Sequence, residues 1–163
     1  MIRFITLLVF ALVTANAAAE ARIAVLDFEL RDLTSLPYTE QEYARTASFK
    51  PLLVNALNKL ARYELISITQ QEQNQANHSP SYLYDHNDAA TQLGQAHQVD
   101  WVLVTQHAKP SYLFSYLMVH LINVKTGQLA ADYKIEMKGN HEKVAEHGIN
   151  SLAKKIHHSL NSY

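Results

Sequence analysis

The sequence contains no cysteine, a single tryptophan and no block of charge of one sign. Without cysteine no disulfide can form, so an ordinary apolar core has to hold the fold together. A lipoprotein needs a cysteine at its processing site, and we therefore expect no lipid anchor. The formal charge is −1 and no basic block is present, so we expect no nucleic-acid partner.

Long apolar runs are also missing, since a membrane-spanning helix takes about 20 apolar residues. The amino-terminal run, residues 4–13, is too short for this; it follows Arg3 and leads into small residues. A positive, an apolar and a small-residue region in this order indicate a secretory signal peptide. Cleavage could follow Ala17, Ala19 or Ala21, and we favour Ala19. A retained amphipathic anchor is the alternative.

We thus predict a signal peptide over residues 1–19 and a single domain over residues 20–163, exported to the periplasm. Of the 14 basic residues the leader removes one, Arg3, which leaves 13 against 15 acidic residues and a formal charge of −2. About 140 residues are enough for one apolar core. No internal repeat and no second domain are visible in the sequence.

The spacing of apolar residues predicts an α/β fold with the order β-α-β-α-β-β-β-α. Strands are predicted at residues 22–30, 63–69, 100–108, 112–124 and 129–138. Right-handed crossovers place the second and third strands on either side of the first. The prediction is a three-layer domain with a mixed five-stranded sheet of order 2-1-3-4-5 and helices on both faces.

The helices are predicted from apolar stripes and from residues that start or break helices. Helical spacing begins near Gln41, and Pro51 predicts either a kink or two helices, the second opening with Pro51 in its first turn. Residues 70–85 are polar and are predicted to form a connection that is partly helical and partly loose. Asn87 or Asp88 is expected to cap a short helix, and the last helix is expected to start at residues 139–140.

Several segments resemble the motifs of a family of exported bacterial proteins of unknown function. The motifs are IAVLDFEL at 23–30, YEL at 63–65, LG at 93–94 with DWVLVT at 100–105, VKTG at 124–127 and GN at 139–140. More distantly, the chain is similar to the amino-terminal domain of TolB and to CsgG-like periplasmic folds. It lacks the β-propeller of TolB and the lipid anchor of CsgG. The resemblance implies a cell-envelope protein that acts by binding other proteins and not by catalysis.

Two acids at the end of the first predicted strand form a candidate ligand site. Asp27 and Glu29 follow a central strand, where open α/β sheets bind ligands, and residues at i and i+2 share a face. Close carboxylates can perform acid–base chemistry, so a small hydrolase is one hypothesis. Arg31 is a local counter-ion. We favour the plainer interpretation, a hydrogen-bonded strand end, because structural ion pairs often imitate sites.

The fourth predicted strand carries two apolar faces. One face holds Leu113, Leu117, Val119 and Leu121, and the other holds Tyr112, Phe114, Tyr116, Met118 and Ile122. The long helices can cover only one of them. Aromatic residues and methionine are enriched at protein interfaces, so the second face is a candidate binding surface. The alternative is a strand that is buried on both sides.

The nine histidines show no spacing typical of zinc ligands, and we expect them at the solvated surface. No cofactor is expected. The leading hypothesis is a non-enzymatic periplasmic accessory protein of the cell envelope that binds an envelope protein, a second copy of itself or a small ligand. The alternatives are a hydrolase that uses Asp27 and Glu29, and a histidine-based sensor of metal or pH.

Overall fold

The computed structural model describes residues 20–34, 39–139 and 142–163. The predicted signal peptide and the predicted start of the last helix at Asn140 lie outside these residues. Along the chain the elements are β1 (Arg22–Val25), β2 (Glu29–Asp32), α1 (Glu40–Leu60), β3 (Glu64–Ile66), α2 (Gln70–Ala76), α3 (Tyr82–Asp85), α4 (Asn87–Ala96), β4 (Trp101–Lys109), β5 (Phe114–Asn123), β6 (Gln128–Lys138) and α5 (Glu142–Leu160). In the described part of the chain no helix is both long and apolar enough to cross a membrane.

The strands form one mixed sheet in the order β3-β1-β4-β5-β6, and β2 pairs with β4 beyond the end of β1. β3, β1 and β4 run parallel, whereas β4, β5 and β6 form an antiparallel meander. The predicted α/β class and the predicted order of the strands are confirmed. The sheet has six strands instead of five because the predicted first strand is divided into β1 and β2.

One extra residue causes this division. Val25 pairs with Leu103 and Glu29 pairs with Gln106, so three residues on the first strand lie opposite two on β4. Such a β-bulge locally disrupts the ladder and changes which face the following side chains occupy. Phe28 therefore shares an apolar core with Val25, although an unbroken strand would point the two side chains to opposite faces.

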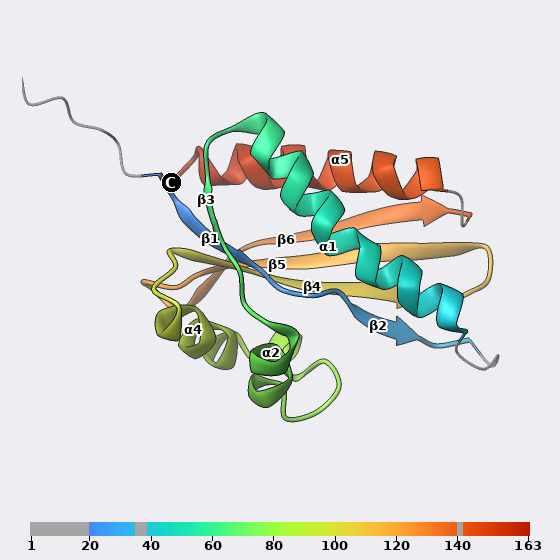
Figure 1. Cartoon of the computed structure of the whole chain (residues 1–163), viewed down its shortest axis with the longest axis horizontal. Helices are drawn as coiled ribbons and strands as arrows, with labels where there is room; N and C mark the ends of the chain where they lie inside the picture. Colours follow the sequence, from blue (N-terminus) through green and yellow to red (C-terminus); the bar gives the residue numbers. More distant parts are fainter. Residues whose placement is uncertain (1–19, 35–38, 140–141) are drawn as a thin grey trace, which may run out of the picture.

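Each face of the sheet carries an apolar core. The helices α1 and α5 cover one face, and the short helices α2, α3 and α4 lie on the other (Figure 1). The first core includes Phe49, Leu53, Leu57, Ile149, Leu152 and Ile156, and the second includes Leu26, Ile68, Leu83, Ala90 and Leu93. Burial of each such leucine or isoleucine stabilises the fold by roughly 1.5–3 kcal/mol.

Of the two alternatives predicted at Pro51, the division into two helices is wrong, because α1 is one helix from residue 40 to residue 60 with the proline inside it. Proline lacks an amide N–H, so the carbonyl of Ala47 receives no helical hydrogen bond from it. Both Pro51 and Ala47 are exposed, which leaves that carbonyl within reach of water. The apolar stripe on either side of the proline stays in register and holds the two halves on one core.

α4 spans the predicted short helix, but neither Asn87 nor Asp88 caps it, since His86 occupies the N-cap position. Its Gly94 packs directly against the sheet. A methyl group at that position would lie 2.6 Å from Val102 and 2.6 Å from Val124. This close approach explains why a residue without a side chain follows the leucine of the LG motif.

Candidate functional site

The bulge after β1 lies at a cleft of about 640 Å³, at the carboxyl ends of β1 and β3. Residues of β2 line it together with α1 on one side and α2 on the other. The charged lining residues are Asp27, Glu29 and Lys50, and the neutral polar ones include Tyr43, Thr46, Ser67, Thr69, Gln70, Gln73, Asn74 and Asn77. The structure thus brings both predicted acids to the edge of the sheet where ligands bind in open α/β folds.

Asp27 is tied to both neighbouring helices. Its Oδ1 lies 3.2 Å from the Nζ of Lys50 on α1. Its main-chain N–H donates to Oε1 of Gln73 on α2 at 2.7 Å, and Nε2 of Gln73 donates to the Asp27 carbonyl at 3.0 Å. The predicted counter-ion was Arg31, which is exposed, so Lys50 corrects that expectation.

Glu29 contacts a different element from Asp27. Its Oε1 accepts a hydrogen bond from the main-chain N–H of Ser81 at 2.7 Å. Ser81 precedes α3 and has a φ of 65°, in the left-handed region that is costly for a residue other than glycine. The two carboxylates therefore act on separate elements, Asp27 on α1 and Glu29 on the α3 turn. The expectation of a jointly oriented carboxylate pair is wrong, because the bulge between them breaks the i, i+2 relation.

A buried ionic network, which we name by its residues Asp32, Glu42, Arg45 and Lys109, lies beneath the first turns of α1. The Nζ of Lys109 lies 2.6 Å from Oε2 of Glu42 and 3.4 Å from Oδ2 of Asp32. Nη1 of Arg45 lies 3.2 Å from Oε1 of Glu42. Two positive and two negative groups balance one another, as buried charges require. The sequence analysis did not identify this network.

The network shifts the pKa values of its acids. Burial raises the pKa of Glu42, but the hydrogen bond and charge of Lys109 and the charge of Arg45 together outweigh burial, so this pKa lies below its usual value. Burial likewise opposes ionisation of Asp32, and hydrogen bonds from Thr34 with the charge of Lys109 lower its pKa. Both acids are therefore charged in the folded protein at neutral pH.

His107 adjoins this network and contradicts the expectation of surface histidines. Its side chain is fully buried, with Nδ1 2.8 Å from Oγ1 of Thr46 and the ring edge-on to Phe49 at 5.0 Å between centroids. Burial lowers the pKa of His107 to about 4, and the positive charge of Arg45 acts in the same direction. The imidazole is therefore neutral at physiological pH.

The part of the chain that the structure describes contains no candidate metal site. Within residues 20–34, 39–139 and 142–163, no three histidine, aspartate or glutamate side chains are grouped so that they could hold an ion. His107 and His120 lie on adjacent strands, but Val104 is the partner of His120 and Leu117 the partner of His107, so the two rings are offset and on opposite faces.

The predicted binding face of the fourth strand is only partly covered. Phe114, Tyr116 and Met118 are half-buried along β5, and Tyr112 just before the strand is 51% exposed. We call these four residues the aromatic surface. Leu113 was expected on the opposite, buried face, but it precedes β5 and is 78% exposed.

The apolar core on this face of the sheet extends over only part of β5. Met118 still packs against the core under α3 and α4, whereas Phe114 and Tyr116 belong to neither apolar core. Phe114 and Tyr116 contact each other edge to face at 5.7 Å, and the Nζ of Lys134 on β6 lies 4.0 Å from the centre of the Tyr116 ring. Aromatic rings and an adjacent ammonium group are thus presented together at the surface.

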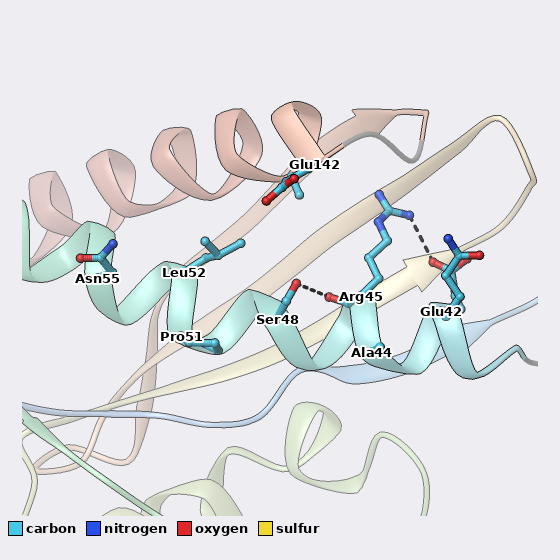
Figure 2. Close-up of a pocket in the computed structure, with 10 residues that line it drawn as sticks. Glu42, Ala44, Arg45, Ser48, Pro51, Leu52, Asn55 and Glu142 are labelled. Atoms are coloured by element: carbon cyan, nitrogen blue, oxygen red, sulfur yellow. Dashed lines mark hydrogen bonds and ion pairs between the residues drawn. The ribbon is translucent and has the colours of Figure 1, made fainter.

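A groove of about 650 Å³ separates α1 from α5 (Figure 2). Ser48, Leu52 and Asn55 of α1 face it, with Glu142 of α5 opposite. Its remaining charged side chains on α1 belong to the ionic network, and Ser48 donates to the main chain of its own helix at 2.6 Å. Three of the polar side chains that line the groove, Glu42, Arg45 and Ser48, are therefore engaged within the fold.

The family of the chain follows from its sequence as a whole. The DUF3280 family model, described as "Protein of unknown function (DUF2380)", matches residues 21–156. The chain belongs to this family. The match spans every element from β1 to most of α5 and agrees with the resemblance to a family of unknown function. No curated protein is similar enough to the chain to count as a match.

Solved structures show the same fold at low sequence identity. The PelC dodecamer from Paraburkholderia phytofirmans is 15% identical with a TM-score of 0.55, over 86% of this chain and 87% of that one. The LpoB C-terminal domain from Salmonella enterica is 18% identical with a TM-score of 0.51, over 76% and 87%. Lipoprotein GNA1162 from Neisseria meningitidis is 16% identical with a TM-score of 0.51, over 86% and 99%. None of these three structures is TolB or CsgG, so they do not support the more distant likeness to those two proteins.

Proposed function

We propose that this protein is a non-enzymatic accessory protein of the bacterial cell envelope, located in the periplasm, and that it binds another protein through the aromatic surface. The observation that carries the proposal is the incomplete cover of β5, where Phe114 and Tyr116 lie beyond both cores. Aromatic residues and methionine at the centre with charged residues around them are typical of a protein interface. The exposed charges alongside are Asp132, Lys134, Glu136 and Lys138 of β6.

The acids of the cleft support a binding protein over a hydrolase. Asp27 is in an ion pair with Lys50, and Glu29 holds the turn before α3. An acid–base catalyst would need at least one carboxylate whose role is not already taken by the fold. The hydrolase hypothesis is therefore not the one that the geometry favours.

The periplasmic location rests on the predicted leader and on the start of β1. Arg22 begins that strand, and the carbonyl of Ala21 accepts a hydrogen bond from the N–H of Glu64 at 3.1 Å. Cleavage after Ala19 would keep this bond, whereas cleavage after Ala21 would remove it. Protein taken from a periplasmic extract should accordingly begin at Glu20, and material that began at Met1 would contradict export.

The partner is another envelope protein or further copies of this chain. One protein of the same fold, PelC, forms a dodecamer, which makes self-association a reasonable first measurement. Tyr116→Glu should weaken association at least about tenfold, because it adds a charge to a surface that has to lose water on binding. Analytical ultracentrifugation measures self-association, and crosslinking in envelope extract measures capture of a partner.

A second variant and a control keep the experiment decisive. Lys134→Glu reverses the charge beside the Tyr116 ring. Because Lys134 is exposed, this change leaves both apolar cores intact. Lys155→Glu makes the same change as Lys134→Glu at an exposed lysine of α5, and it should leave association unchanged. If neither Tyr116→Glu nor Lys134→Glu weakens association while both variants stay folded, the aromatic surface is not the interface.

A further inference from the structure

β2 has an outer edge that no described strand occupies. β3 is only three residues long, and its last residue, Ile66, pairs with Ala24 of β1. The chain then leaves the sheet and enters α2. β2 pairs with β4 on one side, and in the described parts of the chain no strand pairs with it on the other (Figure 1).

The hydrogen bonds to β4 show which main-chain groups point to that outer edge. The N–H of Leu33 donates to β4 at 2.9 Å, so the main chain of Leu33 faces β4. The direction of the main-chain groups alternates along a strand. Arg31 and Glu29 therefore also face β4, and the N–H and C=O of Leu30 point to the outer edge, where the cleft opens.

A side chain already imitates a neighbouring strand at the start of this edge. The carboxamide of Gln73 accepts from the N–H of Asp27 and donates to its C=O, at 2.7 and 3.0 Å. The main chain of an adjacent strand would offer a donor and an acceptor of the same kind. Gln73 is buried and stands where β3 has left the sheet, so the edge at Asp27 is satisfied by an amide in place of a strand.

We propose that the cleft along β2 binds an extended peptide segment of a partner protein, which adds a short strand beside Leu30 in line with β3. Strand addition uses main-chain hydrogen bonds for affinity, and α1 and α2 would flank the added segment. The cleft volume of about 640 Å³ lies within the usual range of binding pockets. This site is separate from the aromatic surface, and the inference does not depend on the proposed function.

The lining of the cleft indicates the chemistry of the segment. Its walls are rich in carboxamides, with Gln70, Asn74 and Asn77 on the side of α2. The ammonium of Lys50 and the carboxylate of Asp27 neutralise each other at 3.2 Å. A charged side chain would have to displace this pair, so the segment should carry small, neutral polar side chains.

The test uses the capped pentapeptide acetyl-TNTQT-amide and amide chemical shifts of the ¹⁵N-labelled protein. Because recognition runs through the main chain, this peptide should bind with a dissociation constant of about 1 mM or lower. The shifts should centre on Leu30 and on residues 43–50 and 70–77. The same peptide with N-methyl groups at alternate residues cannot donate those hydrogen bonds, and it should bind about tenfold more weakly.

A pair of matched variants locates the site on the protein. Ala47→Trp fills the α1 wall of the cleft, and it should weaken peptide binding about tenfold or more. Ala44→Trp makes the same change on the same helix but in the groove toward α5, and it should leave binding unchanged. If Ala47→Trp does not fold, the comparison of the two peptides on the unaltered protein decides the question.

Three results would each overturn the inference. The first is the absence of shift changes up to several times the expected dissociation constant of about 1 mM. The second is equal binding of the methylated and unmethylated peptides, which would show that the main chain is not read. The third is a set of shift changes centred on Phe114 and Tyr116, which would place the peptide on the aromatic surface.

Discussion

At the scale of single residues, Lys109 has the most demanding position in the molecule. Its ammonium group is buried between Glu42 of α1 and Asp32 of β2. Removal of one member of a buried ionic network leaves the remaining charges without compensation, and this usually costs several kcal/mol. Lys109 therefore fixes the amino-terminal half of α1 on the sheet.

We predict that Lys109→Met lowers the free energy of unfolding by about 3 kcal/mol or more, because Glu42 and Asp32 then lose the ammonium group that pairs with both of them. Lys138→Met is the matched control, since Lys138 is 83% exposed and lies 3.8 Å from its partner Glu136. The control should change stability by less than about 0.5 kcal/mol. Urea denaturation of the two variants measures both values, and equal effects would show that the network contributes no more than a surface pair.

The network also shows where sequence reasoning at this scale reaches its limit. The strand over residues 101–109 was predicted almost to its last residue. The burial of its polar end was not, because that depends on side chains of α1 far along the chain. Lys109 and Glu42 are 67 residues apart, and nothing in the local pattern around His107 or Lys109 identifies their partners.

At the scale of elements, α1 contains its own weak point. Pro51 removes one main-chain hydrogen bond from the helix interior, where proline costs about 3 kcal/mol relative to alanine. Proline also restricts the unfolded chain, which recovers about 0.4–1 kcal/mol of that cost. The helix continues through the proline because its apolar stripe packs on the sheet on both sides of the interruption.

We predict that Pro51→Ala raises the free energy of unfolding by about 2–2.6 kcal/mol, the balance of these two effects. Pro110→Ala is the control, because Pro110 is exposed in the turn between β4 and β5, where no helical hydrogen bond is at stake. That change should lower stability by up to about 1 kcal/mol. Thermal melts of both variants show whether each change raises or lowers stability. A loss of stability in Pro51→Ala would show that the proline is required for the path of α1.

The bulge is the element that the sequence could not reveal. In an alternating strand over residues 23–30, Asp27 stands on the face of Ile23 and Val25, and Phe28 on the face of Ala24 and Leu26. Both faces are apolar, so one inserted residue leaves the pattern acceptable in either register. The position of Asp27 beside Lys50 and Gln73 follows from the bulge, and both partners come from helices predicted only in outline.

At the scale of the whole molecule, the sequence was most informative about the order of the strands in the sheet. Three parallel strands with helical connections and a following meander allow few arrangements once crossovers are right-handed, and the predicted order is the one observed. The two cores share the same sheet, because β4 contributes Leu103 to one and Val102 to the other. A change on one face can therefore affect the stability of the entire fold.

The pH dependence of stability is such a whole-molecule property. Burial lowers the pKa of His107 to about 4 and also lowers that of His120, whereas an unfolded histidine has a pKa of about 6.5. Below about pH 6.5 the unfolded chain binds protons that the folded protein does not. The stability contributed by neutral histidines is therefore complete above that pH and is lost as the pH falls toward 4. The lowered pKa values of Glu42 and Asp32 act below this range, because both acids stay ionised until the pH falls below their usual values.

We predict that the free energy of unfolding falls between pH 6 and pH 4.5, with His107 contributing up to about 1.4 kcal/mol per pH unit, the limit for one proton. His107→Gln keeps a polar group beside Thr46 but cannot titrate, so its slope should be smaller by about this amount, whatever its stability at pH 7. The exposed His158→Gln is the control and should keep the full slope. Urea denaturation at several pH values measures the slopes. Equal slopes for the unaltered protein and His107→Gln would mean that His107 takes up its proton in the folded state, and that the interior around Thr46 and Phe49 admits water as the pH falls.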